Sequence, residues 1–377
     1  MKKVAIVNRT NLKNYGSVLQ VYALCEAVSN LGYDSEIIWE EGNVSKNYDF
    51  RLNKIFSTGL KLLTHPHLMK STFSNVKYVQ QHVISDKTVL MFDDFVKSNI
   101  KRRFYPAKLM NKGKVGEMYD KFVCGSDQVW CTTTTYIDPL MYLRFVSQEK
   151  RIAYAPSLGR DYIPNYNVKQ MRRYINEIPN VSVREYTGKR LIKELTGRDV
   201  LVTVDPTLLL PKDKWDEIKV EPVISEKYIL CYFLSTPTKD TQLKLFDYIK
   251  KTDKKVIALN SKLAYIEEHI KVLYPDCGPC EFIGYISKAD CVLTDSYHGM
   301  LFSIICHKQF WSIEREYGEF DQSSRQLSVL RMLDISNRYC CLENPITFDK
   351  IDFSGIDESL REKINESMEY LKVALEN

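Results

Sequence analysis

The chain has 377 residues, of which 44% are hydrophobic and 27% are charged, and its formal net charge is +5. This composition is that of an ordinary soluble globular protein, and the length predicts two domains, each large enough to bury a core. The sequence has no apolar run long enough to span a bilayer, and its first residues turn polar too early for a signal peptide, so we expect a cytoplasmic protein.

Strands and helices alternate through the first half of the chain. The hydrophobic pattern predicts strands at 4–8, 34–39, 121–124, 152–155, 181–183 and 200–204. It predicts helices at 16–31, 168–178 and 185–195, and Gly32 ends the first of these. The segment 44–115 interrupts the alternation and has a mixed pattern that indicates helix only in places.

The alternation resumes in the second half, with strands predicted at 228–234, 255–259 and 290–294 and helices at 238–250, 279–288, 299–306, 324–333 and 358–375. Strands separated by helices of this length predict parallel sheets wound by right-handed crossovers. We therefore expect an α/β fold of two Rossmann-like domains, 1–210 and 211–377, that face each other across a cleft, with a long helix at the C-terminus.

The positive charge is concentrated between residues 44 and 114. This segment contains fourteen Lys or Arg and four Asp, hence +10, which leaves −5 for the remainder of the +5 chain. Its densest part, 97–114, is suited to anionic lipid head groups at the inner face of a membrane, to a phosphorylated acceptor or to a polyanion. A solvated surface explains such a segment as well. The sequence shows no nucleic-acid-binding motif and indicates no oligomeric state.

The ten cysteines lie mostly inside apolar runs, which predicts reduced thiols rather than a disulfide framework. One pair, in Cys277-Gly278-Pro279-Cys280, matches the thioredoxin tetrapeptide, and a helix that starts at Pro279 can lower a thiol pKa. The rest of the chain has no thioredoxin pattern, so a turn before a helix is the favoured interpretation. Zinc-like Cys/His spacing is absent from the sequence, and we expect neither a metal nor a bound cofactor.

The segment 289–305 places a histidine at the start of a helix. An apolar strand ends at Asp295-Ser296, and His298 and Gly299 follow before a helical stretch. Free backbone N–H groups at a helix start favour anions, and a titratable group at the carboxyl end of a strand faces a bound ligand. We expect these four residues to line a ligand site; a histidine that caps the first turn is the alternative.

Two further segments place polar residues after a predicted strand. In the first segment, 14–20, Gly16 permits close approach of a ligand, and Ser17 and Gln20 offer hydrogen bonds. A plain helix cap explains Asn14 and Ser17 almost as well. The second segment, 125–130, contains the candidate ligand residues Gly125, Ser126, Asp127, Gln128 and Trp130. A carboxylate and an amide beside a ring face are suited to a sugar, and a tight turn with a core tryptophan is the alternative.

Two more strand ends carry Ser157 and Arg184, and both should open onto the same cleft. An arginine directly after a strand is suited to bidentate binding of a carboxylate or phosphate; a surface ion pair with Glu185 is the alternative. The sequence Asp205-Pro206-Thr207 ends the first half, and its simplest role is to shape the link between the domains.

Taken together, these segments resemble the polysaccharide pyruvyl transferase family. The resemblance covers nearly the whole chain and rests on six motifs in order: Asn14-Tyr15-Gly16, 125–130, Val183-Arg184-Glu185, Asp205-Pro206-Thr207, 278–282 and 294–299. It implies a two-domain fold similar to GT-B glycosyltransferases, with the acceptor bound by the N-terminal domain and the donor by the C-terminal domain. It also implies transfer of pyruvate from phosphoenolpyruvate to a sugar, usually as a ketal, in polysaccharide biosynthesis.

The resemblance implies a role for each motif. His298 would donate a proton or bind phosphate, and Arg184 would bind the anionic groups of phosphoenolpyruvate, the co-substrate. The loop 14–20 and the segment 127–130 would hold the acceptor, a sugar on a lipid-linked oligosaccharide. No metal is required.

One position departs from the family pattern. Family members carry an arginine two residues before the histidine, where this chain has Ser296, so the second donor-binding cation must come from elsewhere, with Arg325 and Arg338 as candidates. Cys131 also replaces an asparagine that many relatives have. The alternatives are therefore a GT-B-type glycosyltransferase that uses a nucleotide sugar, and a non-catalytic sugar-binding protein tethered through the basic segment.

Overall fold

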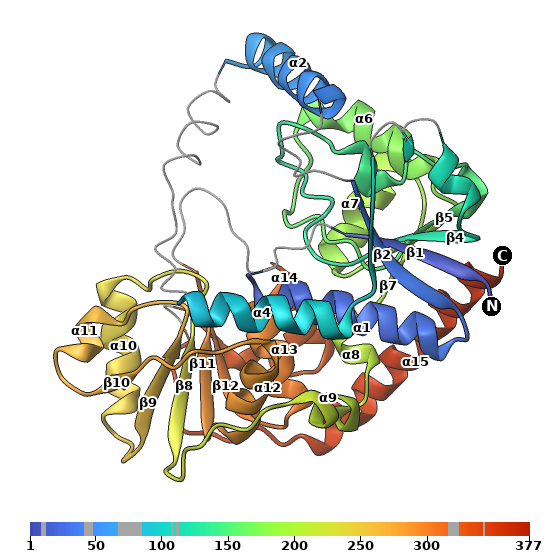
Figure 1. Cartoon of the computed structure of the whole chain (residues 1–377). Coiled ribbons are helices and arrows are strands. Elements are labelled where there is room, and N and C mark those ends of the chain that lie inside the picture. Colours follow the sequence, from blue (N-terminus) through green and yellow to red (C-terminus); the bar gives the residue numbers. More distant parts are fainter. Residues whose placement is uncertain are drawn as a thin grey trace.

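Two parallel β-sheets with flanking helices form the protein (Figure 1). The computed structural model describes residues 1–8, 13–40, 48–66, 85–106, 109–110, 113–315, 324–341 and 344–377. All strand pairings within these residues are parallel, as the alternation of strands and helices predicts. The prediction of an α/β fold with two parallel sheets is confirmed.

The first sheet has the strand order β3-β2-β1-β4-β5-β6-β7. Its core strands are apolar runs such as 4–7, which are fully buried because helices cover both faces of the sheet. The strands are β1 (Lys3–Val7), β2 (Asp34–Glu40), β3 (Arg102–Tyr105), β4 (Lys121–Cys124), β5 (Arg151–Ala153), β6 (Asn180–Val183) and β7 (Leu201–Val202). The helices are α1 (Tyr15–Asn30), α2 (Tyr48–Thr64), α4 (Asp86–Asn99), α6 (Asn165–Asn176) and α7 (Tyr186–Thr196).

The second sheet has the order β10-β9-β8-β11-β12-β13 and follows the short helices α8 (Pro206–Leu209) and α9 (Lys212–Ile218). Its strands are β8 (Tyr228–Tyr232), β9 (Lys255–Leu259), β10 (Val272–Leu273), β11 (Cys291–Thr294), β12 (Gln309–Ile313) and β13 (Tyr339–Cys340). Its helices are α10 (Lys239–Ile249), α11 (Ala264–Glu267), α12 (Pro279–Lys288), α13 (Tyr297–Ile305) and α14 (Ser324–Met332).

Helix α1 joins the two halves, and most of its residues are buried. Tyr15 at its start stacks on Phe282 of α12, with ring centroids 4.5 Å apart, and donates a hydrogen bond to the carbonyl of Cys277. One cluster of buried apolar side chains runs from the first sheet through α1 into the second, and two smaller clusters cover the opposite faces of the sheets. The halves therefore share a hydrophobic core, which fixes the position of the start of α1 between them.

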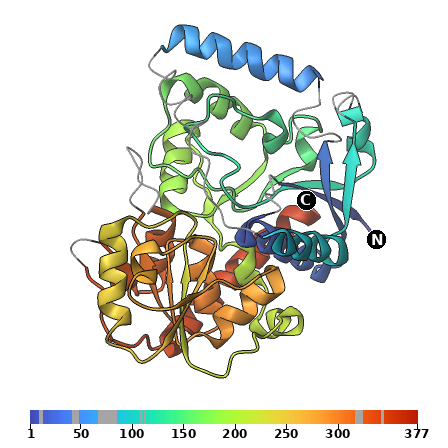
Figure 2. The ribbon, with the colours of Figure 1, turned by 60° about the vertical axis from the view of Figure 1, so that its left-hand side comes forward.

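The predicted C-terminal helix is present as α15 (Ser354–Glu376). It crosses back to the first sheet, so that the C-terminus lies near the N-terminus (Figures 1 and 2). The Tyr370 hydroxyl donates to the carbonyl of Ala153 at 3.0 Å, and the Ser367 hydroxyl accepts from the backbone N–H of Val204 at 3.0 Å. The last helix thus also stabilises the half of the chain that precedes residue 210.

The basic segment contributes directly to the fold. Its described parts form α2, α4 and β3, the edge strand of the first sheet, whereas 44–47, 67–84, 107–108 and 111–112 lie outside the described residues. On the edge strand and beside it, Arg103 pairs with Glu36 at 3.3 Å and Lys101 with Asp34 at 2.9 Å. These ion pairs offset part of its positive charge. Within the part of the chain that the structure describes, no helix is long and apolar enough to cross a membrane.

Candidate functional site

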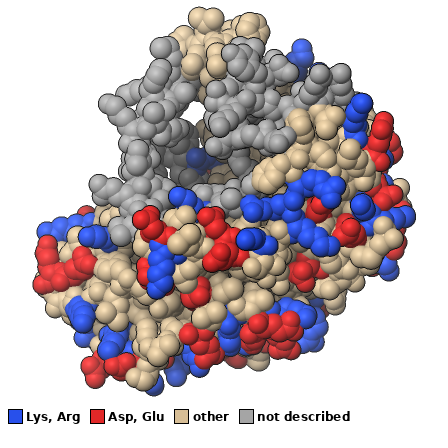
Figure 3. All heavy atoms as spheres, viewed as in Figure 1, with Lys and Arg blue, Asp and Glu red and all other residues tan. Residues whose placement is uncertain are grey.

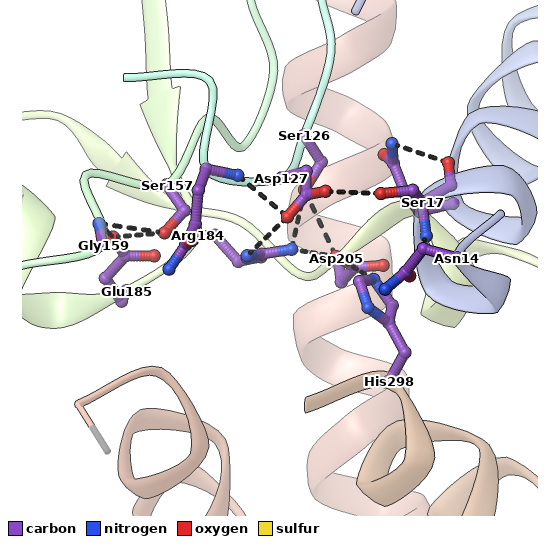
Figure 4. Close-up of polar contacts among 12 residues, drawn as sticks. Asn14, Ser17, Ser126, Asp127, Ser157, Gly159, Arg184, Glu185, Asp205 and His298 are labelled. Carbon is purple, nitrogen blue, oxygen red and sulfur yellow. Dashed lines mark hydrogen bonds and ion pairs between the residues drawn. The ribbon is translucent and has the colours of Figure 1, made fainter. Parts of the chain in front are cut away.

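Polar side chains from both sheets meet where the strands end (Figure 4). From the first sheet come Asp127, Arg184 and Asp205, which follow β4, β6 and β7. From the second comes His298, in the first turn of α13 after β11. Because the strands of each sheet are parallel, their carboxyl ends lie at one edge, where ligands commonly bind. The structure therefore brings these strand ends together, as the sequence predicts.

Arg184 and Asp205 form a buried ion pair at the centre of the site. The Arg184 Nη1 lies 2.6 Å from the Asp205 Oδ2, and their side chains are 1% and 0% exposed. The Ser126 hydroxyl donates to the same Oδ2 at 3.2 Å, and the Asp205 Oδ1 accepts from the Thr207 N–H and hydroxyl. A carboxylate with this many donors is held in one orientation, so the position of Arg184 is fixed as well.

His298 approaches the same carboxylate from the second sheet. Its Nε2 lies 3.5 Å from the Asp205 Oδ2, and its side chain is 9% exposed. Burial by itself raises the pKa of Asp205, but His298 and Arg184 outweigh burial and hold that pKa well below its usual range. Asp205 therefore stays an anion that can orient the imidazole of His298. Among the described residues, the His298 Nε2 has no hydrogen-bond partner, so its contact with Asp205 at this distance is electrostatic.

Gly16 is required by His298 rather than by a ligand. A Cβ at this position, in the first turn of α1, would lie 2.1 Å from the His298 Nδ1 and 2.3 Å from its Cγ. Only a glycine leaves space for the imidazole here. The prediction that Gly16 permits a close approach is correct in geometry, but the approaching group belongs to the protein.

Asp127 lies beside the ion pair in a left-handed backbone conformation, with φ 74°. Its Oδ2 accepts from the Ser17 hydroxyl at 2.9 Å, its Oδ1 accepts from the Gln128 N–H at 2.9 Å, and the Arg184 Nη2 lies 3.9 Å away. Burial raises the pKa of Asp127, but Arg184 and His298 outweigh it, so the pKa is lowered. The two predicted segments, 14–20 and 125–130, thus meet through the contact between Ser17 and Asp127.

A second arginine reaches the site from α14. The guanidinium carbons of Arg184 and Arg325 lie 4.4 Å and 5.8 Å from the centroid of the Tyr297 ring. Burial, together with the charges of Arg184 and Arg315, lowers the pKa of Arg325 to about 10. No carboxylate among the described residues lies within ion-pair distance of Arg325. Arg325, a candidate from the sequence for the second donor-binding cation, thus lies close to Arg184.

Several buried polar atoms around the Tyr297 ring have no hydrogen-bond partner among the residues that the structure describes. They are Nε and Nη2 of Arg184, Nε of Arg325, Nε2 of His298, Oε2 of Glu185 and the hydroxyl of Tyr297. Each such atom costs about 1–3 kcal/mol if it stays unsatisfied. A cavity of about 10 Å³, space for one water molecule, adjoins Arg184, Asp205 and Tyr297 and is otherwise lined mainly by apolar side chains. The grouping of these unpartnered polar atoms indicates a site built for a polar ligand.

Three residues of this site were not predicted from the sequence: Asp205, Tyr297 and Glu185. The sequence suggests that Asp205 shapes the link between the domains, and its side chain does cap the short helix α8. The available signal was its position directly after a strand, the same signal that selected Arg184. Glu185 Oε1 accepts from the Ser157 hydroxyl and the N–H of Leu158, so it is not the surface residue considered from the sequence.

Trp130 and Ser157 do not offer a ligand surface, which corrects their predicted role. Trp130 is 1% exposed, stacks on Tyr142 at 4.9 Å and donates through its Nε1 to the carbonyl of Met141. Ser157 is fully buried, and its hydroxyl donates to Glu185. Both support the loops that carry the site instead of contacting a ligand.

The residues around His298 are also occupied within the protein. The Ser296 hydroxyl accepts from the N–H of Gly299, as a helix cap, and the Asp295 carboxylate accepts from the Leu234 N–H and pairs with Arg315. A Cβ on Gly299 would lie 2.6 Å from the Thr294 hydroxyl, so this glycine serves packing. These three residues therefore have structural partners, and the ligand contacts predicted for Asp295, Ser296 and Gly299 stay predictions. The residue that caps the helix is Ser296 and not the histidine, as the alternative interpretation had it.

Four further positions have structural roles. Asn14 caps α1 through the Ser17 N–H, Gln20 donates to the Ser17 carbonyl within that helix, and a Cβ on Gly125 would lie 3.0 Å from Leu24. Arg338, the second candidate cation, lies over the Trp311 ring in the opposite layer of the second sheet. It does not reach the site.

The Cys277–Cys280 motif has no redox geometry. Cys277 is buried and both thiols are free. Burial raises the pKa of Cys280 to about 11 and that of Cys277 further, whereas a redox motif needs a lowered value. Among the described residues, no group of three or more His, Cys, Asp or Glu is placed to hold a metal ion.

The model of the family described as polysaccharide pyruvyl transferase matches residues 14–317. No curated protein is similar enough in sequence to match. Among solved structures, the chain is similar to UDP-GlcNAc 2-epimerase from Neisseria meningitidis, with a TM-score of 0.46 and 10% identity over 99% of this chain and 94% of that chain. It is also similar to Arabidopsis thaliana UGT89C1, with a TM-score of 0.49 and 12% identity over 99% and 94% of the two chains. Nothing about a ligand follows from likenesses at this level.

Proposed function

Since the chain belongs to the polysaccharide pyruvyl transferase family, we propose that it transfers a pyruvyl group from phosphoenolpyruvate to a sugar of a polysaccharide precursor. Phosphoenolpyruvate is protonated at its methylene carbon, a sugar hydroxyl attacks the central carbon, and the bond from that carbon to the phosphate oxygen breaks. A second hydroxyl then closes the ketal. The two hydroxyl protons of the sugar end on the new methyl group and on phosphate, so the reaction balances without a cofactor.

The pair of arginines around Tyr297 is the observation that carries this proposal. Arg184 and Arg325 lie against the same ring, and nitrogen atoms of both lack hydrogen-bond partners. Two buried cations this close repel each other, which is why Arg184 contributes to the lowered pKa of Arg325. A carboxylate and a phosphate on one small molecule would relieve this repulsion and satisfy both guanidinium groups. Arg325 thereby replaces the cation that the family pattern has at Ser296.

His298 is the proton donor in this proposal. Asp205 lies 3.5 Å from its Nε2 and stays ionised, so its charge can orient the ring beside the bound donor. The starts of α1 and α13 lie on either side of the ring, and their dipoles favour the negative charge of the donor.

On the acceptor side, groups with unused hydrogen-bonding capacity are the Oε2 of Glu185 and the side-chain amide of Gln128, which is half-buried. A carboxylate oxygen and an amide are suited to sugar hydroxyls. Both carboxylate oxygens of Asp127 accept hydrogen bonds from the protein, so we assign Asp127 the role of positioning Arg184 and Ser17.

Binding and product analysis test the proposal. We expect isothermal calorimetry to detect phosphoenolpyruvate, and mass spectrometry of candidate lipid-linked sugars to show a pyruvate-sized addition. Arg325→Ala should abolish donor binding, whereas Arg331→Ala, an exposed arginine on the same helix α14, should not change it. Binding of a nucleotide sugar without binding of phosphoenolpyruvate would overturn the proposal in favour of a glycosyltransferase.

A further inference from the structure

Helix α2 exposes an apolar surface that nothing in the described chain covers. Ile55, Phe56, Leu60 and Leu63 are 68%, 76%, 54% and 80% exposed. At about 100° per residue, the four side chains fall within an arc of about 140° on one side of the helix. Other large exposed apolar residues are spread along the chain, whereas these four lie within nine positions of one helix. Such a concentration marks an interaction surface.

The attachment of α2 to the protein is polar, which is the reverse of the usual arrangement. Lys61 donates from its Nζ to the Oδ1 of Asn167 at 2.6 Å and lies 5.5 Å from the ring centroid of Tyr166, both on α6. His65, just after the helix, also contacts the Tyr166 ring. A helix on the surface of a globular protein normally turns its apolar side inward. Here the apolar side is the exposed one. The helix itself lies at the edge of the molecule next to α6 (Figure 1); Figure 2 shows the same arrangement from another side.

The charge of this region indicates which partner would contact the apolar surface of α2. The sequence of α2 contains three basic residues and one aspartate, and the whole segment 44–114 carries +10 from fourteen Lys or Arg and four Asp. Figure 3 shows the described part of α2 as a surface almost without charged side chains. An apolar arc on a helix of net positive charge is the pattern of helices that lie in the interface of an anionic bilayer.

We infer that α2 binds the surface of an anionic lipid bilayer, with Ile55, Phe56, Leu60 and Leu63 inserted at the level of the acyl chains. The sequence pointed to residues 97–114 for such a contact. That stretch includes Arg103, which pairs with Glu36 of the protein, and its described residues offer no comparable apolar arc. Docking through α2 would hold the first half of the chain at the membrane. This inference does not depend on the identity of the donor.

Vesicle flotation of the full-length protein tests the inference. The probes are vesicles of phosphatidylcholine alone and of phosphatidylcholine mixed with phosphatidylglycerol. We expect the protein to float with the mixed vesicles and only weakly with the neutral ones. The double variant Phe56→Ser and Leu63→Ser should lower the partition coefficient about tenfold or more, because each side chain contributes apolar area to insertion. The control is Leu90→Ser with Val223→Ser, whose side chains are also exposed but lie outside α2.

Three results would overturn the inference. The wild-type protein could remain in the bottom fraction of the gradient with both kinds of vesicle, or the α2 variant could float as well as the control. A third is a wild-type dimer in analytical ultracentrifugation that the α2 variant dissociates, without vesicle binding, which would make α2 an interface between copies. Circular dichroism and thermal unfolding of each variant confirm that it is folded, as serine at positions this exposed permits.

Discussion

Replacement of Asp205 by asparagine tests whether the buried ion pair organises the site. The substitution keeps the size of the side chain and removes its charge. Its oxygen can still accept from Thr207, but the new amide N–H₂ group then faces the guanidinium of Arg184 and the imidazole of His298, besides the Ser126 hydroxyl. The guanidinium is left as a buried cation without its main partner.

The expected cost follows from the burial of the pair. The side chains of Arg184 and Asp205 are 1% and 0% exposed, so water cannot replace the lost carboxylate. Breaking a buried pair of this kind costs about 3–5 kcal/mol of the free energy of unfolding. Asp199→Asn is the matched control: its pair with Lys189 has the side chains 62% and 37% exposed, so we expect a loss of about 0–1 kcal/mol.

The pH dependence gives an independent measurement. Because the pKa of Asp205 is held below its usual range, its carboxylate stabilises the fold above the pKa of the unfolded chain, about 3.9. This contribution is lost as the pH falls from about 4 toward the lower folded value. Urea unfolding followed by circular dichroism should therefore show a difference between wild type and Asp205→Asn that is full at pH 7 and shrinks below about pH 4.

A double-mutant cycle with Arg184→Met separates the pair from its surroundings. If the two residues act together, the double variant loses clearly less stability than the two single variants combined. The reasoning is refuted if the losses add, or if Asp205→Asn costs no more than Asp199→Asn.

Three smaller predictions concern other parts of the chain. Gly16→Ala displaces the His298 ring and should lower the pyruvyl transfer rate about a hundredfold, whereas Gly355→Ala, with open space around its Cβ, should leave the rate unchanged; equal rates would contradict this. Trp130→Phe should lower the unfolding temperature but leave the KM for the acceptor sugar unchanged, since its ring is in the core. Cys280, with a pKa raised to about 11, should react with iodoacetamide at pH 7 no faster than free cysteine, and fast alkylation would argue for a redox role.

The central strands were predictable because parallel strands covered on both faces are continuous apolar runs. The missed strands lack this signal. β3 contains Arg102 and Arg103, charges that an edge strand tolerates because one side of it is unpaired. β12 contains Gln309 and Ser312 among its apolar residues, and β10 and β13 have only two residues each. Their pairing depends on the completed sheet and not on local sequence.

The sequence predicted the residues of the candidate site better than the contacts between them. The pattern selected Arg184 and His298 because each polar residue follows a strand. The same pattern gave Asp205 a different role. The contact of Asp205 with Arg184 exists only because β6 and β7 are adjacent in the sheet, which the local sequence does not show. For Trp130 the same residues fit a sugar platform or a core tryptophan, and only packing against Tyr142 decides between these. Capping residues such as Ser296 are similarly ambiguous until their hydrogen bonds are known.

The position of Asp205 connects the arrangement of the two halves to the chemistry of the site. Its Oδ2 contacts Arg184 of the same sheet at 2.6 Å and His298 of the other sheet at 3.5 Å. A small rotation of one half would change the second distance and leave the first unchanged, because only His298 belongs to the second sheet. The shared core through α1 resists such a rotation, and Gly16 keeps the start of that helix against the imidazole. The packing between the sheets, and not the strand ends alone, therefore determines the orientation of His298 that the proposed proton transfer requires.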